Sequence, residues 1–197
     1  MTTWVENPRG GRDRGLRGIV RAWAEVLGRP RRFFRHGVAP GDQAPGLVFA
    51  VAMAVIYAAS LSVLDPSRFP AGGPLRAAVT VLLVGVLVAP AVLHLLAALQ
   101  TLLLMAVVRD RAGVSETVQV IAYATAPAPF AAIPIPEVRV ACCLYGATLL
   151  VVGLGVVHDT TRLRAFVAGT VPAVLLFGVG FGGSDALVDL LLSWYII

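Results

Sequence analysis

Apolar residues in this chain are gathered into long runs that contain no charged side chain. No Asp, Glu, Lys or Arg occurs in Gln43–Leu64, Ala77–Val108, Thr117–Pro136, Val140–His158 or Ala165–Ser184. An ionised side chain at the centre of an inserted helix costs about 2.5–3.5 kcal/mol, and roughly 20 apolar residues cross a bilayer as a helix. The pattern therefore predicts an all-α, polytopic membrane helix bundle with five transmembrane helices. The apolar cores of these helices are Leu47–Leu64, Ala78–Val108, Val118–Ile135, Val140–Val157 and Ala165–Gly182.

The second run, Ala77–Val108, is longer than one membrane crossing needs. At 1.5 Å per residue it extends about 48 Å, against a hydrocarbon core of about 30 Å. Pro90 lies near its middle, but a split there leaves two pieces too short to span. The sequence therefore predicts one long helix that is tilted or kinked and projects beyond the bilayer.

The third run is interrupted by prolines. Pro127 and Pro129 remove two backbone donors within three residues, and Pro134 and Pro136 follow. In lipid, the carbonyls freed by a proline need partners from protein or water. We expect this span to be broken and enclosed by other helices, with Tyr123 and Thr125 placed to help satisfy the break. The alternative is a helix that simply ends early, before Pro134.

A segment with helical periodicity precedes the first span. Leu16, Ile19, Trp23 and Leu27 recur at helical spacing with arginines largely between them, which is typical of an amphipathic helix at a membrane interface. The alternative is a helix packed on cytoplasmic loops. The candidate membrane-surface residues of this region are Arg17, Arg21, Trp23, Arg31, Arg32, Phe33 and Phe34.

These patterns divide the chain into four parts. Residues 1–13 are expected to form a flexible N-terminus and residues 14–45 a cytoplasmic amphipathic and basic segment. Residues 46–183 form the five-span membrane domain, and residues 184–197 form a short apolar tail. The pattern leaves open whether this tail is interfacial or continues the last span.

Arginine placement predicts the orientation. The chain has 16 basic residues, all arginine, and a formal net charge of +5. Thirteen of them lie before the first span or in the loops after the second and fourth, and three on the opposite side. The positive-inside rule places the N-terminus in the cytoplasm and the C-terminus outside, in the cell membrane. This distribution favours anionic lipid headgroups as partners over nucleic acid.

Polar residues within spans are candidate functional positions because they are costly in lipid. His94 and Gln100 lie in the second run, and His158 and Asp159 close the fourth. We interpret the first two as interhelical hydrogen-bonding groups and the His–Asp pair as a helix-end hydrogen-bonding group. The sequence has no zinc-protease, serine-hydrolase or phosphate-loop motif and no acidic pair at intramembrane depth, so we predict no catalytic residue, metal or cofactor.

Three short motifs occur in an order that resembles the Yip family of Ypt/Rab-GTPase-interacting membrane proteins, in its prokaryotic branch. The first is Arg29-Pro30-Arg31-Arg32-Phe33-Phe34, followed by Gly41-Asp42 and Pro45; the others are Gly113-Val114-Ser115 with Tyr123 and Pro127, and His158 with Thr160 and Thr161. The resemblance implies a five-span membrane protein. Eukaryotic members bind prenylated small GTPases, but this chain lacks their long polar N-terminal region and acidic Asp-Leu-x-Gly-Pro segment. The resemblance therefore does not imply that this chain binds Rab GTPases.

Three functional hypotheses remain. The first is a non-enzymatic membrane protein that organises lipids, partner proteins or copies of itself. The second is a small permease or channel along the third span, which a water-filled cavity reaching His94 or Tyr123 would favour. The third is an intramembrane enzyme using His158 and Asp159, which a pocket converging on His158 with a further acid or hydroxyl would favour.

Overall fold

A computed structural model describes residues 15–70 and 72–195 of the protein, and every regular element in these ranges is helical. The expected flexible segment 1–13 lies outside them. The elements, with η marking 3₁₀ or π turns, are α1 (Gly15–Gly28), α2 (Pro30–Gly37), α3 (Ala44–Leu64), η1 (Pro66–Arg68), α4 (Gly73–Leu83), η2 (Val84–Val88), α5 (Ala89–Val107), α6 (Val114–Ala124), η3 (Ala128–Ala132), α7 (Pro136–Val157), α8 (Arg162–Ala173), η4 (Val174–Gly180) and α9 (Gly183–Ser193).

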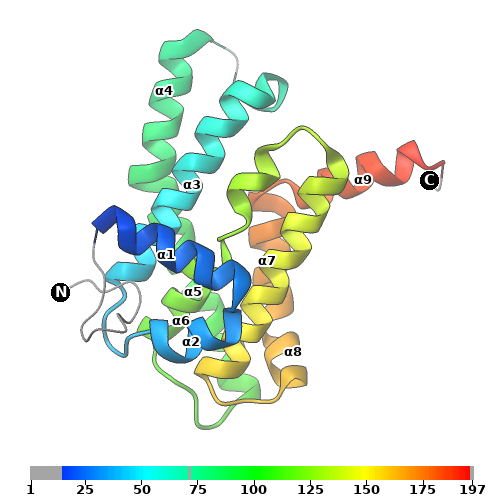
Figure 1. Cartoon of the computed structure of the whole chain (residues 1–197). Coiled ribbons are helices and arrows are strands. Elements are labelled where there is room, and N and C mark those ends of the chain that lie inside the picture. Colours follow the sequence, from blue (N-terminus) through cyan, green and yellow to red (C-terminus); the bar gives the residue numbers. More distant parts are fainter. Residues whose placement is uncertain (1–14, 71, 196–197) are drawn as a thin grey trace.

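The predicted membrane helix bundle is confirmed. Among the described residues, four helices are long and apolar enough to cross a membrane: Ala44–Leu64, Gly73–Val107, Pro136–Val157 and Arg162–Gly180. The third predicted span, Val118–Ile135, corresponds to α6 and η3, which are too short to count as one uninterrupted helix. They lead from the end of the bundle where α5 stops to the end where α7 begins (Figure 1), so the five-span plan is compatible with the structure.

The second span is one long helix, as predicted. Residues Gly73–Val107 are continuous over 35 positions. The π-helical turn η2 ends two residues before Pro90, and the proline ring disturbs the regular hydrogen-bond ladder there. Its first part, α4, has no buried residue and stands beside the upper part of α3 (Figure 1).

The third span is broken where the prolines predicted it. Helix α6 ends at Ala124, and η3 begins after Pro127. Every residue from Thr117 to Pro129 is buried, with α3, α5 and α7 packed around the segment. The expected break is confirmed, and neighbouring helices enclose it as far as Pro129, whereas Phe130 just beyond it is 42% exposed.

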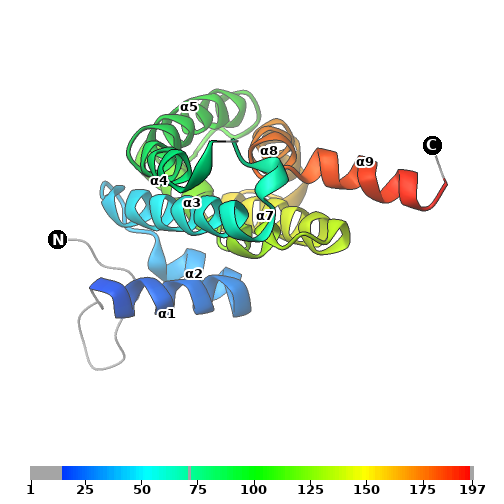
Figure 2. The same cartoon turned by 90° about the horizontal axis from the view of Figure 1, so that it is seen from above.

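The bundle is layered when seen along the spans. In Figure 2, α3 and α7 form a middle layer, with α1 and α2 on one side and α4, α5 and α8 on the other. We call the end where α3, α6 and α8 begin and α5 and α7 stop the basic end, because Arg109, Arg111, Arg162 and Arg164 lie there.

The N-terminal helix α1 lies on the flank of the bundle, not on loops. Ala22 and Val26 are fully buried, whereas Leu16 and Val20 are exposed. The Tyr145 hydroxyl of α7 donates a hydrogen bond to the Leu27 carbonyl, about 18 Å along α7 from its last residue. The amphipathic helix is therefore present, and its depth relative to lipid stays a prediction.

The aromatic pair of α2 corrects one expectation. Phe33 and Phe34 are only 3% and 2% exposed, so assigning them to the membrane surface was wrong. In the short helix that begins at Pro30, both rings face the bundle while Arg31, Arg32 and Arg35 stay outside. Gly153 makes room for Phe34, since a Cβ there would lie 2.9 Å from the Phe34 ring.

The C-terminal tail does not continue the last span. Gly182 adopts a left-handed conformation with φ of 69°, which turns the chain into the separate helix α9. Figure 1 shows α9 leading away from the bundle. Its Asp185 and Asp189 form ion pairs with Arg68, the last residue of η1.

Candidate functional site

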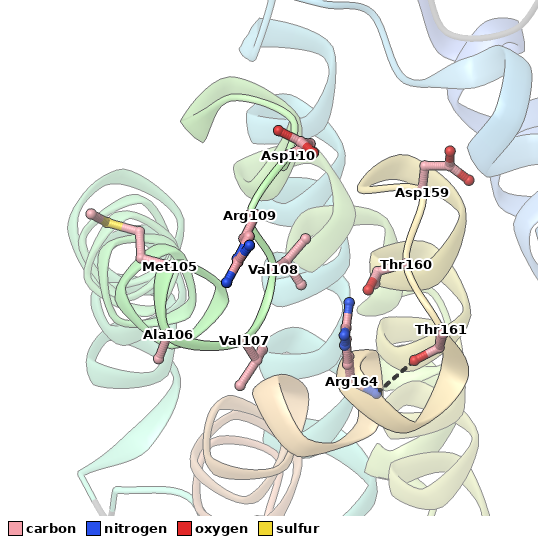
Figure 3. Close-up of a pocket in the computed structure, with 10 residues that line it drawn as sticks. All are labelled: Met105, Ala106, Val107, Val108, Arg109, Asp110, Asp159, Thr160, Thr161 and Arg164. Carbon is pink, nitrogen blue, oxygen red and sulfur yellow. Dashed lines mark hydrogen bonds between the residues drawn. The ribbon is translucent and has the colours of Figure 1, made fainter.

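The basic end contains a polar pocket between the end of α5 and the start of α8. It has a volume of about 460 Å³. Figure 3 shows its walls: Met105 to Asp110 on one side and Asp159, Thr160, Thr161 and Arg164 on the other. The Arg164 side chain extends beside Thr160 into the space between the two walls, and Arg109 faces the same space from the α5 side.

A second polar pocket lies on the other side of the same turn. It has a volume of about 380 Å³ and is lined by Arg31 and Arg35 of α2 and by Arg162 of α8. Asp159 and Thr160 line both pockets. The turn between α7 and α8 is therefore bordered by five arginines that come from three separate parts of the chain.

These five arginines are unneutralised. Within residues 15–70 and 72–195, the guanidinium groups of Arg31, Arg35, Arg109, Arg162 and Arg164 make no hydrogen bond or ion pair. Asp110 and Asp159 border the pockets, but in Figure 3 their carboxylates point away from Arg164. Arginine donors aimed at a shared space favour a ligand with phosphate or carboxylate oxygens.

The local sequence builds this turn in three steps. Helix α7 ends at Val157, and Asp159 takes a positive φ of 43°, a conformation that Asp tolerates better than most residues. The Thr160 amide then donates to the Gly155 carbonyl over 3.1 Å. Thr161 caps α8 by accepting a hydrogen bond from the Arg164 amide over 3.4 Å, so the positive end of the α8 dipole points toward the first pocket.

His158 supports the turn from inside. Its side chain is 1% exposed, and Nε2 lies 3.4 Å from the Thr117 hydroxyl of α6. Burial, and secondarily the charge of Arg111, lower the pKa of His158 to about 4. His158 does not line either arginine pocket. This position fits the predicted hydrogen-bonding role at the helix end.

The candidates at the proline break are brought together. The Tyr123 ring lies between Phe33 and Phe49, with ring centroids 4.6 and 5.1 Å away. The Thr125 hydroxyl donates to the Ala122 carbonyl over 2.7 Å. The carbonyls of Tyr123 and Thr125 accept from the amides three residues later, over 3.1 and 2.8 Å. Pro127 and Pro129 have no amide proton to donate to these carbonyls, and the tighter three-residue turns supply the missing hydrogen bonds.

Two further donors close the break, and sequence reasoning did not assign them this role. The Trp23 indole donates to the Ala126 carbonyl over 2.6 Å, and the Arg139 Nε donates to the Ala131 carbonyl over 2.7 Å. Trp23 also stacks on Phe130, with centroids 5.4 Å apart. Trp23 is half-buried, and its indole N–H bonds within the bundle, while its expected place at the headgroup boundary stays a prediction.

His94 and Gln100 lie apart. Gln100 is buried and donates to the Ala168 carbonyl of α8 over 3.0 Å, which is the predicted interhelical role. His94 is exposed on α5, and its Nδ1 lies 2.7 Å from the Pro90 carbonyl of its own helix. The interhelical role predicted for His94 is therefore not observed among the described residues.

Sequence reasoning used the loop arginines only to assign orientation. Arg35, Arg109, Arg162 and Arg164 were not named as site residues, because nothing in the sequence shows that α2, α5 and α8 meet at one turn. The available signal was that Arg162 and Arg164 directly follow Thr160 and Thr161 in the sequence. Among the described residues, no group of three or more His, Cys, Asp or Glu side chains is placed to hold a metal ion.

Comparison with known proteins places the chain in a family. The family model of the Yip1 domain matches residues 24–183, which include α2 to η4 and the whole basic end. No curated protein and no solved structure matches the chain. The resemblance seen in the sequence motifs is confirmed, while the prokaryotic branch stays a prediction. The chain is a multi-pass membrane protein and belongs to the Yip1 domain family.

Proposed function

We propose that this protein is a non-enzymatic membrane protein that binds anionic phospholipid headgroups at its basic end and thereby organises lipids around the bundle. The observation that carries the proposal is the set of five unneutralised arginines around the α7–α8 turn. Guanidinium groups held in pockets recognise phosphate oxygens well. Membership of the Yip1 domain family, which is not in general an enzyme family, agrees with a binding role.

The surroundings of the pockets favour a lipid over a soluble anion. Met105, Leu163 and Phe166 are 56%, 71% and 58% exposed beside the arginines, and such apolar surface is stable in contact with acyl chains. A phospholipid would place its phosphate against the arginines and its chains along this surface.

The proposed orientation places the basic end and the N-terminus in the cytoplasm and the C-terminus outside the cell membrane. Thirteen arginines lie on the proposed cytoplasmic side and three on the other, which supports this orientation. The cytoplasmic leaflet is also the one rich in anionic lipid. A reporter active only in the cytoplasm should give signal when fused after Arg111 and none when fused at Ile197. Signal at Ile197 would refute this topology.

The two other functions have less support. An apolar cavity of about 320 Å³ bordered by α3, η2, α5, α6 and η4 is lined by neither His94 nor Tyr123, and a cavity reaching one of them was the criterion for a permease. For an enzyme, His158 has a hydroxyl partner in Thr117, but it lines neither of the two polar pockets at the basic end.

The test is native mass spectrometry of the purified full-length protein with phosphatidylglycerol or phosphatidylcholine. We expect preferential retention of phosphatidylglycerol that added salt weakens. Arg109→Gln and Arg164→Gln should each reduce retention about fivefold, corresponding to about 1 kcal/mol per arginine. Glycerol phosphate, tested as a competitor, should displace the lipid weakly because it lacks acyl chains.

Arg76→Gln is the matched control. It makes the same charge change at an exposed residue at the opposite end of the bundle, and it should leave retention within twofold. Equal losses for all three variants would show a general effect of net charge. Equal retention of the two lipids would overturn headgroup recognition.

A further inference from the structure

We infer that an apolar cavity bordered by α3, η2, α5, α6 and η4 holds the acyl chain of a membrane lipid. The cavity has a volume of about 320 Å³, within the range of about 300–1,000 Å³ typical of ligand pockets. It shares no lining residue with the two arginine pockets. The inference is therefore independent of the proposed headgroup site.

Three irregular helix segments meet around this cavity. The π turn η2 contributes Val84 and Val88, and the π turn η4 contributes Leu176 and Gly180. Thr125 lines the cavity at the point where α6 stops. Single π turns inside helices are frequent at functional sites, and here two of them and a proline break border one space.

The hydroxyl groups at the cavity already have acceptors. The Tyr57 hydroxyl donates to the Phe181 carbonyl over 3.3 Å, and Thr125 donates to Ala122 over 2.7 Å. The rest of the lining is aliphatic or aromatic apart from Arg68. A hydrocarbon chain therefore enters without leaving either hydroxyl proton unpaired.

Arg68 is the one charged side chain among the described residues that line the cavity, and its charge is compensated. Its guanidinium pairs with Asp65 at 3.4 Å, with Asp185 at 3.8 Å and with Asp189. Three carboxylates around this cation leave no positive potential to recruit an anion. The chemistry thus favours an uncharged chain and distinguishes this cavity from the basic end.

The cavity reaches the lipid-facing surface of the second span. Val88 and Val92 line it and are 46% and 38% exposed. Gly85 brings η2 close against α3, since a Cβ there would lie 2.7 Å from a methyl group of Val55. Beyond this contact, α4 has no buried residue. An acyl chain can therefore enter sideways from the bilayer.

The test uses full-length protein in nanodiscs containing a phosphatidylcholine with a photoactivatable diazirine in its acyl chain. Ile121 and Thr125 are 1% and 5% exposed and line the cavity, so a chain reaches them only from within it. We expect cross-links at these two residues, mapped by mass spectrometry. Ala54→Phe and Gly180→Leu each fill the cavity from a different wall and should reduce these cross-links at least fivefold.

Two control variants test whether the cross-linked chain lies in the cavity itself. Ala98→Phe adds the same bulk as Ala54→Phe on the exposed face of α5 and should leave the cross-links unchanged. Arg164→Gln should also leave these cross-links unchanged, although it reduces the retention of phosphatidylglycerol. Cross-links confined to lipid-facing residues in the unsubstituted protein would overturn the inference. So would cross-links at Ile121 and Thr125 that persist in both filled variants.

Discussion

The two ends of the bundle use arginine in opposite ways. At the end opposite the basic end, Arg68 and Arg139 share Asp65, and Arg68 also pairs with two carboxylates of α9. At the basic end, Arg109 and Arg164 face one pocket with no described carboxylate in ion-pair range. A paired arginine holds elements of the fold together, whereas an unneutralised one in a pocket is available for a ligand. The same residue type thus indicates structure at one end and binding at the other.

The largest expected difference between the ends comes from removing one carboxylate. The Arg139 side chain is 4% exposed, and its Nη2 lies 3.4 Å from Asp65. Asp65→Asn leaves that guanidinium buried without its charge partner, so we expect a loss of about 3 kcal/mol in the free energy of unfolding. Asp159→Asn at the basic end is the matched change and should stay within about 0.5 kcal/mol. Unfolding in mixed detergent measures both, and similar losses would contradict the comparison.

Acid should act on the two ends in different pH windows. Because burial and Arg111 lower the pKa of His158 to about 4, the unfolded chain binds its proton first. The stabilisation of the folded state by neutral, buried His158 is therefore complete above about pH 6.5. It is lost as the pH falls toward 4, which lowers the free energy of unfolding by an amount on the order of 3 kcal/mol. At the opposite end, the Ser67 hydroxyl, and next Arg139, lower the pKa of Asp65. Ionised Asp65 therefore goes on stabilising the folded state until the pH falls below the ordinary pKa of a carboxyl group.

Measurements of unfolding at pH 7.5 and pH 5 test this difference. The unsubstituted protein should lose stability between the two, and His158→Gln should lose much less. His94→Gln, at an exposed histidine, should behave like the unsubstituted protein. A pH dependence that survives His158→Gln would assign the loss to another group.

The parts of the fold that sequence predicted are those that the bilayer dictates locally. Charge-free runs, the long second helix and the break at Pro127 follow from the cost of charges and unpaired carbonyls in lipid. The donors that close the break were not predictable in the same way. Trp23 lies 103 residues from Ala126, and Arg139 was counted only as a loop charge. Such contacts depend on how helices pack.

The candidate site could be predicted from the sequence only in part, for the same reason. Arg109 lies in the loop after α5 and Arg164 in the first turn of α8, and only the packing of α5 against α8 brings them to one pocket. The sequence pattern did place Arg31 and Arg32 outside the bundle, but it placed Phe33 and Phe34 there too. An eight-residue helix with two aromatic residues on its inner face reverses that assignment.

The smallest expected effect on stability comes from replacing one arginine at each end of the bundle, Arg68 and Arg164. Arg68→Gln removes a partly exposed cation from three carboxylates, and exposed ion pairs contribute only about 0.2–1 kcal/mol each. We therefore expect it to lower the free energy of unfolding by about 1 kcal/mol. Arg164→Gln breaks no ion pair and lessens repulsion with Arg109 in the same pocket, so stability should stay within about 0.5 kcal/mol while lipid retention falls. Paired unfolding and retention measurements on both variants decide the matter. If Arg164→Gln destabilises the protein as much as Arg68→Gln, the basic-end arginines hold the fold together, and the distinction between a structural end and a binding end is wrong.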